Sequence, residues 1–393
     1  MRILRSTAII GATALALTMV SMGSALADPA STPATTSIVA VGSDTIQYVA
    51  DSFSTSYNGS SPAPANPFYS WDATNPTTGL PGDTIKTKND ANCSITRPNG
   101  SGAGIAQLQA QIKTTGGTEY CVDLARSSRN IQASDGAGLI SVLFAHDLIT
   151  YAINSGGHGV TNLTDADLTA IFECNDTALG GTGHPVTWNE VGGTSTDAIV
   201  PVLPQSSSGT RSQWLLDIGL TNTTIGSCVV NGTFGGNPIE ENEGTNAVYT
   251  ATGNPTGYQD ALAIYSGGVY LCQTTTSNCG TINTAQGNLK IEDIDGKAPL
   301  TTTTPVTLNI GTKTPFPPTY IRGLYFVAKN GGTATAPKVP TPTTANPWPI
   351  DLTKFLGNGN NTGYICSTAA ATIVKSYGFV PQTGTLCGTL TGQ

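Results

Sequence analysis

The chain has 393 residues, of which 38% are hydrophobic, 11% are charged and 46 are glycine, so it is long enough for one large globular domain or two medium ones. About a quarter of an average soluble protein is charged, so this surface must consist mainly of Ser, Thr, Asn and Gly. The net charge of −8, from 17 basic and 25 acidic residues, argues against non-specific nucleic-acid binding, which needs a basic face.

The first 27 residues are typical of a secretory signal peptide. Arg2 and Arg5 form a basic start, residues 8–20 are apolar, and Ala25-Leu26-Ala27 matches the small-residue cleavage pattern. A membrane anchor is the alternative, although this apolar stretch is short and no later stretch reaches the length of a span. We expect cleavage after Ala27, secretion to the outside or the cell envelope, and a mature net charge of −10.

The cysteines predict covalent cross-links. Eight cysteines in an exported chain predict four disulfides, and because the first is Cys93, far from the cleavage point, we do not expect a lipoprotein. With only three histidines and no CxxC pair, no metal site is predicted. Short loops close first during folding, so neighbours are predicted to pair in order: Cys93–Cys121, Cys174–Cys228, Cys272–Cys279 and Cys366–Cys387.

After residues 28–37, a Pro/Ser/Thr-rich leader that we expect to be disordered, strands and helices alternate. In chain order, the patterns predict a strand at 38–41, a helix over 46–57, a helix over 101–112, a strand at 120–125, a β-forming run at 139–153, a helix over 164–172, a strand at 199–203, a helix over 210–218 and a helix at 369–377. Loop-type composition separates them at 58–83 and 330–349. This alternation predicts an α/β fold with mainly parallel sheets.

Three segments lead through glycine and hydroxyl residues into a predicted helix. They are Gly42-Ser43-Asp44-Thr45, Gly100-Ser101-Gly102 and Ser208-Gly209-Thr210. A helix start offers unpaired N–H groups and partial positive charge, glycine admits a ligand, and Ser or Thr adds a donor. Converging on one cleft, the three would bind a small oxyanion; the alternative is ordinary helix capping, for which Ser and Thr are also preferred.

The order of these segments resembles that of the phosphate-binding proteins of bacterial phosphate ABC transporters. Residues 187–189, 288–299 and 377–381 resemble further parts of that family, so the resemblance covers roughly 38–390, with insertions at 58–95 and 330–349. It implies a two-lobed type II periplasmic binding-protein-like fold, each lobe a mainly parallel sheet flanked by helices. We expect lobe one at 38–144 and 310–393, lobe two at 145–309, and a ligand between them.

Residue by residue, the resemblance implies a ligand site at the helix starts. The implied contacts are Thr45, Ile46, Ser101, Ser208, Gly209 and Thr210. Ser128 stands where the family has a proton-accepting Asp and Pro204 where it has an Arg, so we expect weaker phosphate binding and poorer discrimination against sulfate. Asp44 is the candidate replacement acceptor. Arg126, Arg129 or Arg211 would replace the cation, unless they are solvated surface residues.

The sequence therefore predicts a secreted, monomeric solute-binding protein without a cofactor, which captures a small oxyanion, foremost phosphate, for an ABC permease. No enzyme is predicted, because there is no nucleophile elbow or dinucleotide motif. The acidic run 240–243 is expected to be an exposed loop, His146 a core residue, and His158 and His184 lack partners at metal-ligand spacing. The alternative function is an extracellular adhesion or surface-assembly protein that keeps the fold without transport.

Overall fold

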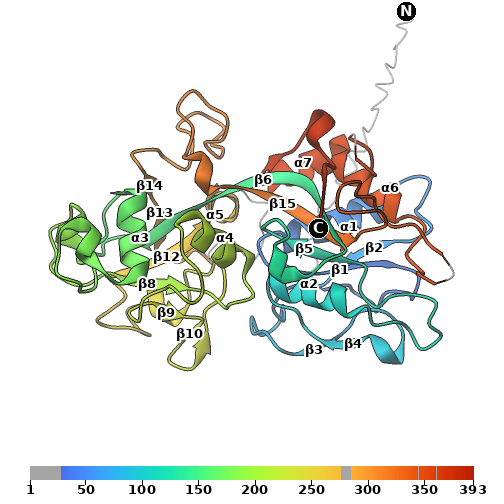
Figure 1. Ribbon diagram of the computed structural model, residues 1–393, viewed down its shortest axis with the longest axis horizontal. Coiled ribbons are helices and arrows are strands. Elements are labelled where there is room, and N and C mark those ends of the chain that lie inside the picture. Colours follow the sequence, from blue (N-terminus) through green and yellow to red (C-terminus); the bar gives the residue numbers. More distant parts are fainter. Residues whose placement is uncertain (1–27, 276–284, 344, 360) are drawn as a thin grey trace, which may run out of the picture.

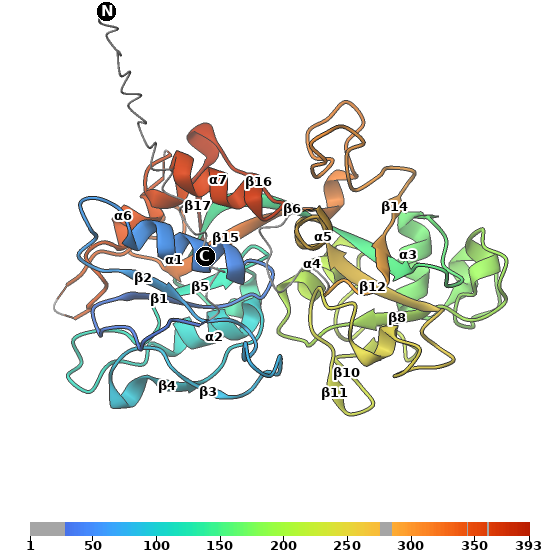
Figure 2. The ribbon, with the colours of Figure 1, turned by 180° about the vertical axis from the view of Figure 1, so that it is seen from behind.

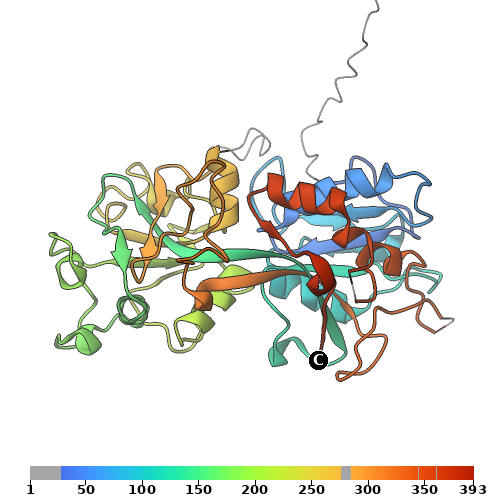
Figure 3. The same cartoon turned by 90° about the horizontal axis from the view of Figure 1, so that it is seen from above.

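The computed structural model describes residues 28–275, 285–343, 345–359 and 361–393, so the predicted signal peptide lies outside the described residues. Figure 1 shows two lobes joined by two long strands, β6 (Leu139–Asn154) and β15 (Ile321–Lys329). Seen from above in Figure 3, the two strands run together from one lobe to the other. They pair antiparallel, from Ile321 opposite Leu148 to Lys329 opposite Leu139.

Lobe one is built on three parallel strands. Across the sheet, the order is β2 (Phe68–Ser70), β1 (Ile38–Gly42) and β5 (Leu124–Ser127), then β15 and β6. Strand β15 runs antiparallel to both of its neighbours, β5 and β6. Every residue of β1 is buried, as expected for a continuous apolar run within a parallel sheet covered on both faces. Figure 2 shows α1 (Gln47–Asn58) and α7 (Thr368–Ser376) above these strands and α2 (Ser101–Ala110) below them.

Lobe two repeats this plan around β12 (Ala261–Ser266). Parallel strands β8 (Val200–Leu203) and β9 (Val230–Asn231) follow it on one side, and β6 pairs with it antiparallel on the other. Its helices are α3 (Asp165–Glu173), α4 (Gly209–Asp217) and α5 (Gly267–Thr275). The two-lobed α/β fold is therefore the one that the sequence predicted.

Shorter elements complete both lobes. The remaining strands are β3 (Thr84–Lys86), β4 (Ser94–Thr96), β7 (Asn162–Leu163), β10 (Thr233–Phe234), β11 (Asn237–Pro238), β13 (Leu289–Ile291), β14 (Asp293–Ile294), β16 (Val380–Pro381) and β17 (Leu390–Gly392). One more α-helix is α6 (Leu352–Leu356), and the 3₁₀ turns are Ala91–Cys93, Ala133–Asp135, Asp176–Leu179, Trp188–Val191, Ala247–Tyr249, Pro318–Tyr320, Tyr364–Cys366 and Gly384–Leu386. Among the described residues, no helix has both the length and the apolar character needed to cross a membrane.

Separate apolar cores show where the chain changes lobe. Phe144 packs in one apolar core and Leu148 in the other, so we propose that the chain leaves lobe one between these residues. On the return, Tyr320 still packs in lobe two, where its ring centroid lies 5.5 Å from that of Trp214, whereas Leu324 packs in lobe one. We therefore propose that the chain returns within β15, rather than at the predicted residue 310.

The predicted disordered leader is instead held in place. Both carboxylate oxygens of Asp28 accept hydrogen bonds of 2.7 Å from the guanidinium of Arg97. Further along, Asn89 N donates to Pro33 O at 2.8 Å. The prediction of disorder for residues 28–37 was wrong because a polar composition does not reveal a bidentate ion pair with a residue 69 positions away.

Three of the four predicted disulfides are confirmed. They are Cys93–Cys121, Cys174–Cys228 and Cys366–Cys387. The fourth prediction, Cys272–Cys279, lies outside the described residues because Cys279 falls in 276–284. Each of the three confirmed disulfides joins two cysteines that are consecutive in the sequence, as predicted.

Candidate functional site

The three predicted helix starts meet where the lobes face each other. Gly102 N at the start of α2 donates to Ser207 O, just before α4, at 2.9 Å. Thr45 Oγ1, just before α1, lies 3.3 Å from Thr210 Oγ1 in the first turn of α4. In Figure 1, α2 and α4 lie on the facing sides of the two lobes. The fold thus brings together hydroxyls from positions 165 residues apart.

Ordinary capping accounts for one of the three segments. Ser208 is the N-cap of α4, and its Oγ accepts a hydrogen bond from Arg211 N at 2.9 Å. The N-caps of α1 and α2, Ile46 and Gly100, make no side-chain capping bond to any described residue. The hydroxyls of Thr45 and Ser101 are therefore not used as caps, and both side chains are buried at the contact between the lobes.

Ser101, Ser128 and Gly209 form a second contact beside Thr45 and Thr210. Ser101 Oγ accepts from Ser128 N at 3.1 Å and lies 3.4 Å from Ser128 Oγ. Gly209, from lobe two, lies against both serine hydroxyls. We call Thr45, Ser101, Ser128 and Thr210 together the hydroxyl cluster.

A carboxylate from lobe two contacts the hydroxyls of both Thr45 and Thr210. Glu241 Oε2 accepts hydrogen bonds from Thr45 Oγ1 at 3.1 Å and from Thr210 Oγ1 at 2.7 Å. Glu241 is only 3% exposed, and its Oε1 is buried without a hydrogen-bond partner among the described residues. The expectation that residues 240–243 form an exposed loop was wrong, because this loop turns into the contact between the lobes.

The cation next to the cluster is Arg322 of β15. Its Nη1 donates to Thr210 Oγ1 at 2.8 Å, and its Nε and Nη2 donate to Asp147 Oδ2 at 3.1 and 2.7 Å. Asp147 also accepts from Ser266 Oγ and Gly268 N. Arg322 was not among the predicted site residues, although a charged residue inside an otherwise apolar strand pattern is a usable signal.

The three arginines considered as replacement cations lie elsewhere. All three are buried, so the surface-residue alternative was wrong. The hydrogen bonds described for their guanidinium groups lead away from the hydroxyl cluster: Arg126 to Gly42 O, Ser43 O, Ser70 Oγ and Trp71 O; Arg129 to Asn130 O and Asp135; Arg211 to Pro204 O, Asn222 and Asn231. They brace loops around the site instead of entering it.

Carboxylates dominate the electrostatics beside Glu241. A cavity there is lined by Asp44, Glu240, Glu241 and Glu243, which we call the acidic cavity. Burial raises the pKa of Asp44 well above its usual range, and the nearby carboxylates Glu241, Glu240 and Glu243 raise it further. Burial also raises the pKa of Glu240 to about 7 and that of Glu243 above its usual value. Asp44, the candidate acceptor, therefore lies among carboxylates and takes a hydrogen bond from Asn242 Nδ2 at 3.2 Å.

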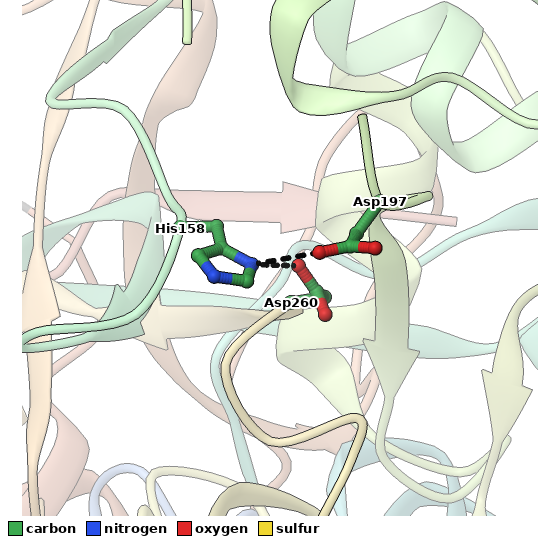
Figure 4. Close-up of side chains that lie close together, drawn as sticks. All are labelled: His158, Asp197 and Asp260. Carbon is green, nitrogen blue, oxygen red and sulfur yellow. Dashed lines mark hydrogen bonds and ion pairs between the residues drawn. The ribbon is translucent and has the colours of Figure 1, made fainter. Parts of the chain in front are cut away.

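Away from the hydroxyl cluster, histidines and carboxylates gather in two places. Figure 4 shows His158, whose Nδ1 lies 2.8 Å from Asp260 Oδ1 and 3.3 Å from Asp197 Oδ2. Asp260 Oδ1 also accepts from Trp188 Nε1 at 2.9 Å. The second group is Asp176, His184 and Glu190. Each group offers one nitrogen and two oxygens of the kind that bind divalent cations. The expectation that His158 and His184 lack such partners was therefore wrong; Asp260 lies 102 residues from His158, beyond the reach of local spacing.

Comparisons with known proteins agree on the fold. A model of the PBP superfamily domain matches residues 27–336. An ABC-type phosphate transport receptor from Vibrio cholerae is 18% identical, with a TM-score of 0.50 over 87% of this chain and 99% of that chain. A candidate phosphate ABC transporter substrate-binding protein from Clostridium perfringens, solved with bound phosphate, is 16% identical, with a TM-score of 0.50 over 88% and 99%. No curated protein matches significantly.

Proposed function

This chain belongs to the PBP superfamily, and from that premise we propose that it is a solute-binding protein whose two lobes close around a small oxyanion. One observation carries the proposal. Two hydroxyls from opposite lobes, those of Thr45 and Thr210, both donate to a single carboxylate oxygen, Glu241 Oε2. Two members of the hydroxyl cluster, Thr45 and Thr210, thus bind one carboxylate oxygen, and hydroxyl donors to such an oxygen make strong, charge-assisted bonds.

Phosphate is the oxyanion that we propose, for delivery to an ABC permease. Support comes from the order of the helix starts, and from Arg322 Nη1 at 2.8 Å from Thr210 Oγ1, which supplies a cation near the cluster. Ser128 in place of a carboxylate removes the group that would repel a fully deprotonated anion, so we propose that sulfate also binds. The full proposal is a secreted, monomeric binding protein without enzymatic activity, lacking a lipid anchor and released by cleavage after Ala27.

Isothermal titration calorimetry of the mature protein with phosphate, sulfate and molybdate tests this proposal. We expect phosphate binding in the wild type or in Glu241→Ala, and its loss when Thr45→Val and Thr210→Val are added, since valine keeps the shape and removes the donor. Folding of each variant is checked by its melting temperature. Absence of anion binding by both the wild type and Glu241→Ala contradicts the proposal.

A second function is favoured by the occupied cluster itself. Two of the hydroxyls expected to contact a ligand, those of Thr45 and Thr210, already bind Glu241. Pro204 and Ser128 replace the two charged groups that the resemblance implies. An extracellular adhesion or surface-assembly protein could keep this closed fold without a solute. It requires that no anion binds to any of the variants above.

A further inference from the structure

We propose that the Glu241 carboxylate is an internal oxyanion, which occupies the ligand position, latches the two lobes together and must be displaced before phosphate binds. The inference rests on the function proposed above, because it concerns the same site. It assigns to Glu241 the control of ligand affinity and of lobe closure.

The latch consists of bonds that cross between the lobes. Thr45 precedes α1 of lobe one, whereas Glu241 and Thr210 belong to lobe two. The bond from Thr45 Oγ1 to Glu241 Oε2 therefore joins the lobes through an anionic acceptor. A free oxyanion held by the same two hydroxyls would make an equivalent connection, which is why the carboxylate stands in for a ligand.

Hydrogen bonds to Asn242, in the loop of residues 240–243, fix the position of the neighbouring Glu241. Asn242 adopts the left-handed conformation, with φ of 55°, which asparagine tolerates well. Its backbone oxygen accepts from Tyr265 Oη at 2.5 Å and from Gln273 Nε2 at 3.0 Å, and its Oδ1 accepts from Ser266 N at 2.9 Å. Asn242, next to Glu241, is thus held within lobe two by two hydrogen bonds to its backbone oxygen and one to its side chain.

The Glu241 carboxylate makes only part of the hydrogen bonds that a bound oxyanion could make. Only Oε2 of the carboxylate receives hydrogen bonds, and Oε1 is buried with no hydrogen-bond partner in the described part of the chain. A buried acceptor without a partner is unfavourable, and more so when it is charged. A tetrahedral oxyanion offers more oxygens to Thr45, Thr210 and their surroundings, so it is able to compete with the carboxylate.

Charge reinforces the competition. Glu241 lies in the acidic cavity with Asp44, Glu240 and Glu243. Arg322, which donates to Thr210 beside it, is already paired with Asp147 at 2.7 Å. Because the pKa values of Asp44, Glu240 and Glu243 are raised, an incoming anion meets both a bound competitor and this negative charge at a pH that ionises these carboxylates. Removing Glu241 relieves both effects, whereas Glu241→Gln removes the charge and leaves an oxygen acceptor in place.

Glu240 provides a matched control on the same loop. Its Oε2 also contacts lobe one, accepting from Asn99 Nδ2 at 2.7 Å, but it does not bond to the hydroxyl cluster within the described structure. Glu240→Gln keeps an oxygen acceptor for Asn99, and above about pH 7, where Glu240 is ionised, it removes one charge near the site. Any effect of general charge in the cavity should appear in this variant as well.

The first arm of the test measures lobe closure without a ligand, by small-angle X-ray scattering of the mature chain. We expect the wild type and Glu240→Gln to share one compact radius of gyration, and Glu241→Ala to show a larger one. Melting curves and circular dichroism show whether each variant folds, and Glu241→Gln provides a second, more conservative change. Equal radii for folded Glu241→Ala, Glu241→Gln and wild type overturn the latch, whatever the protein binds.

The second arm measures binding of inorganic phosphate by calorimetry. We expect Glu241→Ala and Glu241→Gln to bind at least tenfold more tightly than the wild type, and Glu240→Gln to stay within about threefold of it. Equal affinities of the wild type and the Glu241 variants overturn the competition. Opening of Glu241→Ala without phosphate binding by any variant supports the latch and overturns the proposed oxyanion function, so the two failures are distinguishable.

Discussion

Gly209 of lobe two lies so close to Ser101 of lobe one that a β-carbon on Gly209 would be 2.1 Å from Ser101 Oγ. The same β-carbon would lie 2.5 Å from Ser128 Oγ. Neither distance is sterically allowed, so the contact between the start of α4 and lobe one requires a residue without a side chain. Closure of the lobes is therefore tied to this glycine as well as to Glu241.

Gly209→Ala should hold the lobes apart while leaving α4 intact. Alanine is a better helix former than glycine, so the helix itself gains stability, and the clash falls only on the contact between the lobes. We expect a larger radius of gyration in solution scattering. Gly116→Ala is the control, because the nearest atom to its added β-carbon is 3.7 Å away; a Gly209→Ala protein as compact as this control would contradict the prediction.

Substitutions of Ser208 and Thr210, two residues apart, should affect different properties: the first the stability of the fold, the second the binding of phosphate. Ser208 Oγ caps α4, so Ser208→Ala should lower the free energy of unfolding by about 1 kcal/mol. Thr210 Oγ1 instead bonds to Glu241 and receives a bond from Arg322. Thr210→Val should weaken phosphate binding, measured in the Glu241→Ala background, by about 1–3 kcal/mol. Denaturant unfolding measures the stability of the two variants, and calorimetry measures their affinity for phosphate. Equal losses of affinity in Ser208→Ala and Thr210→Val would contradict the prediction that only Thr210 contributes to binding.

Local patterns carried most of the correct sequence predictions. The hydroxyl-rich helix starts and the neighbouring cysteine pairs depend on residues close in sequence, so periodicity and spacing reveal them. The Glu241–Thr45 bond joins positions 196 residues apart, and no local pattern signals it. The acidic run was assigned to the surface because charged residues are usually exposed, and only the closed arrangement of the lobes buries it. Arg322 was missed for the same reason, since its partners Asp147 and Thr210 lie on distant elements.

The acidic cavity predicts that stability falls as the pH rises. Burial raises the pKa of Glu240 from 4.5 to about 7 in the folded protein, so between these values the folded state holds a proton that the unfolded state has lost. This contribution is complete below about pH 4.5 and is lost as the pH rises through 7. The raised pKa values of Asp44 and Glu243 act in the same direction.

Glu240→Gln tests this directly, because glutamine stays neutral at every pH. Since Glu240 is partly exposed, we expect the variant to be about 1–2 kcal/mol more stable than the wild type at pH 8 and to gain nothing at pH 4.5. Urea unfolding at several pH values measures the difference. A gain that is equal at both ends of this range would show that the effect is not a titration.

The stability lost when a disulfide is removed should increase with the length of the loop that it closes. The Cys174–Cys228 bond closes a loop of 54 residues and the Cys366–Cys387 bond one of 21. Loop-closure entropy predicts losses of about 4 and about 3 kcal/mol when each pair is replaced by alanines. Chemical denaturation of the two double variants gives the order, and a larger loss for the shorter loop would indicate that native packing, rather than the unfolded chain, controls the effect.

The buried pair of Arg322 and Asp147 should be far more sensitive to the loss of one partner than an ion pair with an exposed partner. Asp147 Oδ2 lies 2.7 Å from Arg322 Nη2, and the carboxylate also accepts from Ser266 and Gly268, so it ties β6, β15 and the start of α5 together where the chain crosses between lobes. Asp147→Ala leaves the guanidinium buried and uncompensated, which should cost about 3–5 kcal/mol of unfolding free energy. Lys354→Ala is the control, because Lys354 is 69% exposed where it pairs with the buried Asp351. Its removal leaves no buried cation, so we expect a loss of about 1 kcal/mol or less. Losses of similar size in the two variants would mean that Arg322 finds water or another acceptor once Asp147 is gone, and that the crossing between lobes does not depend on this pair.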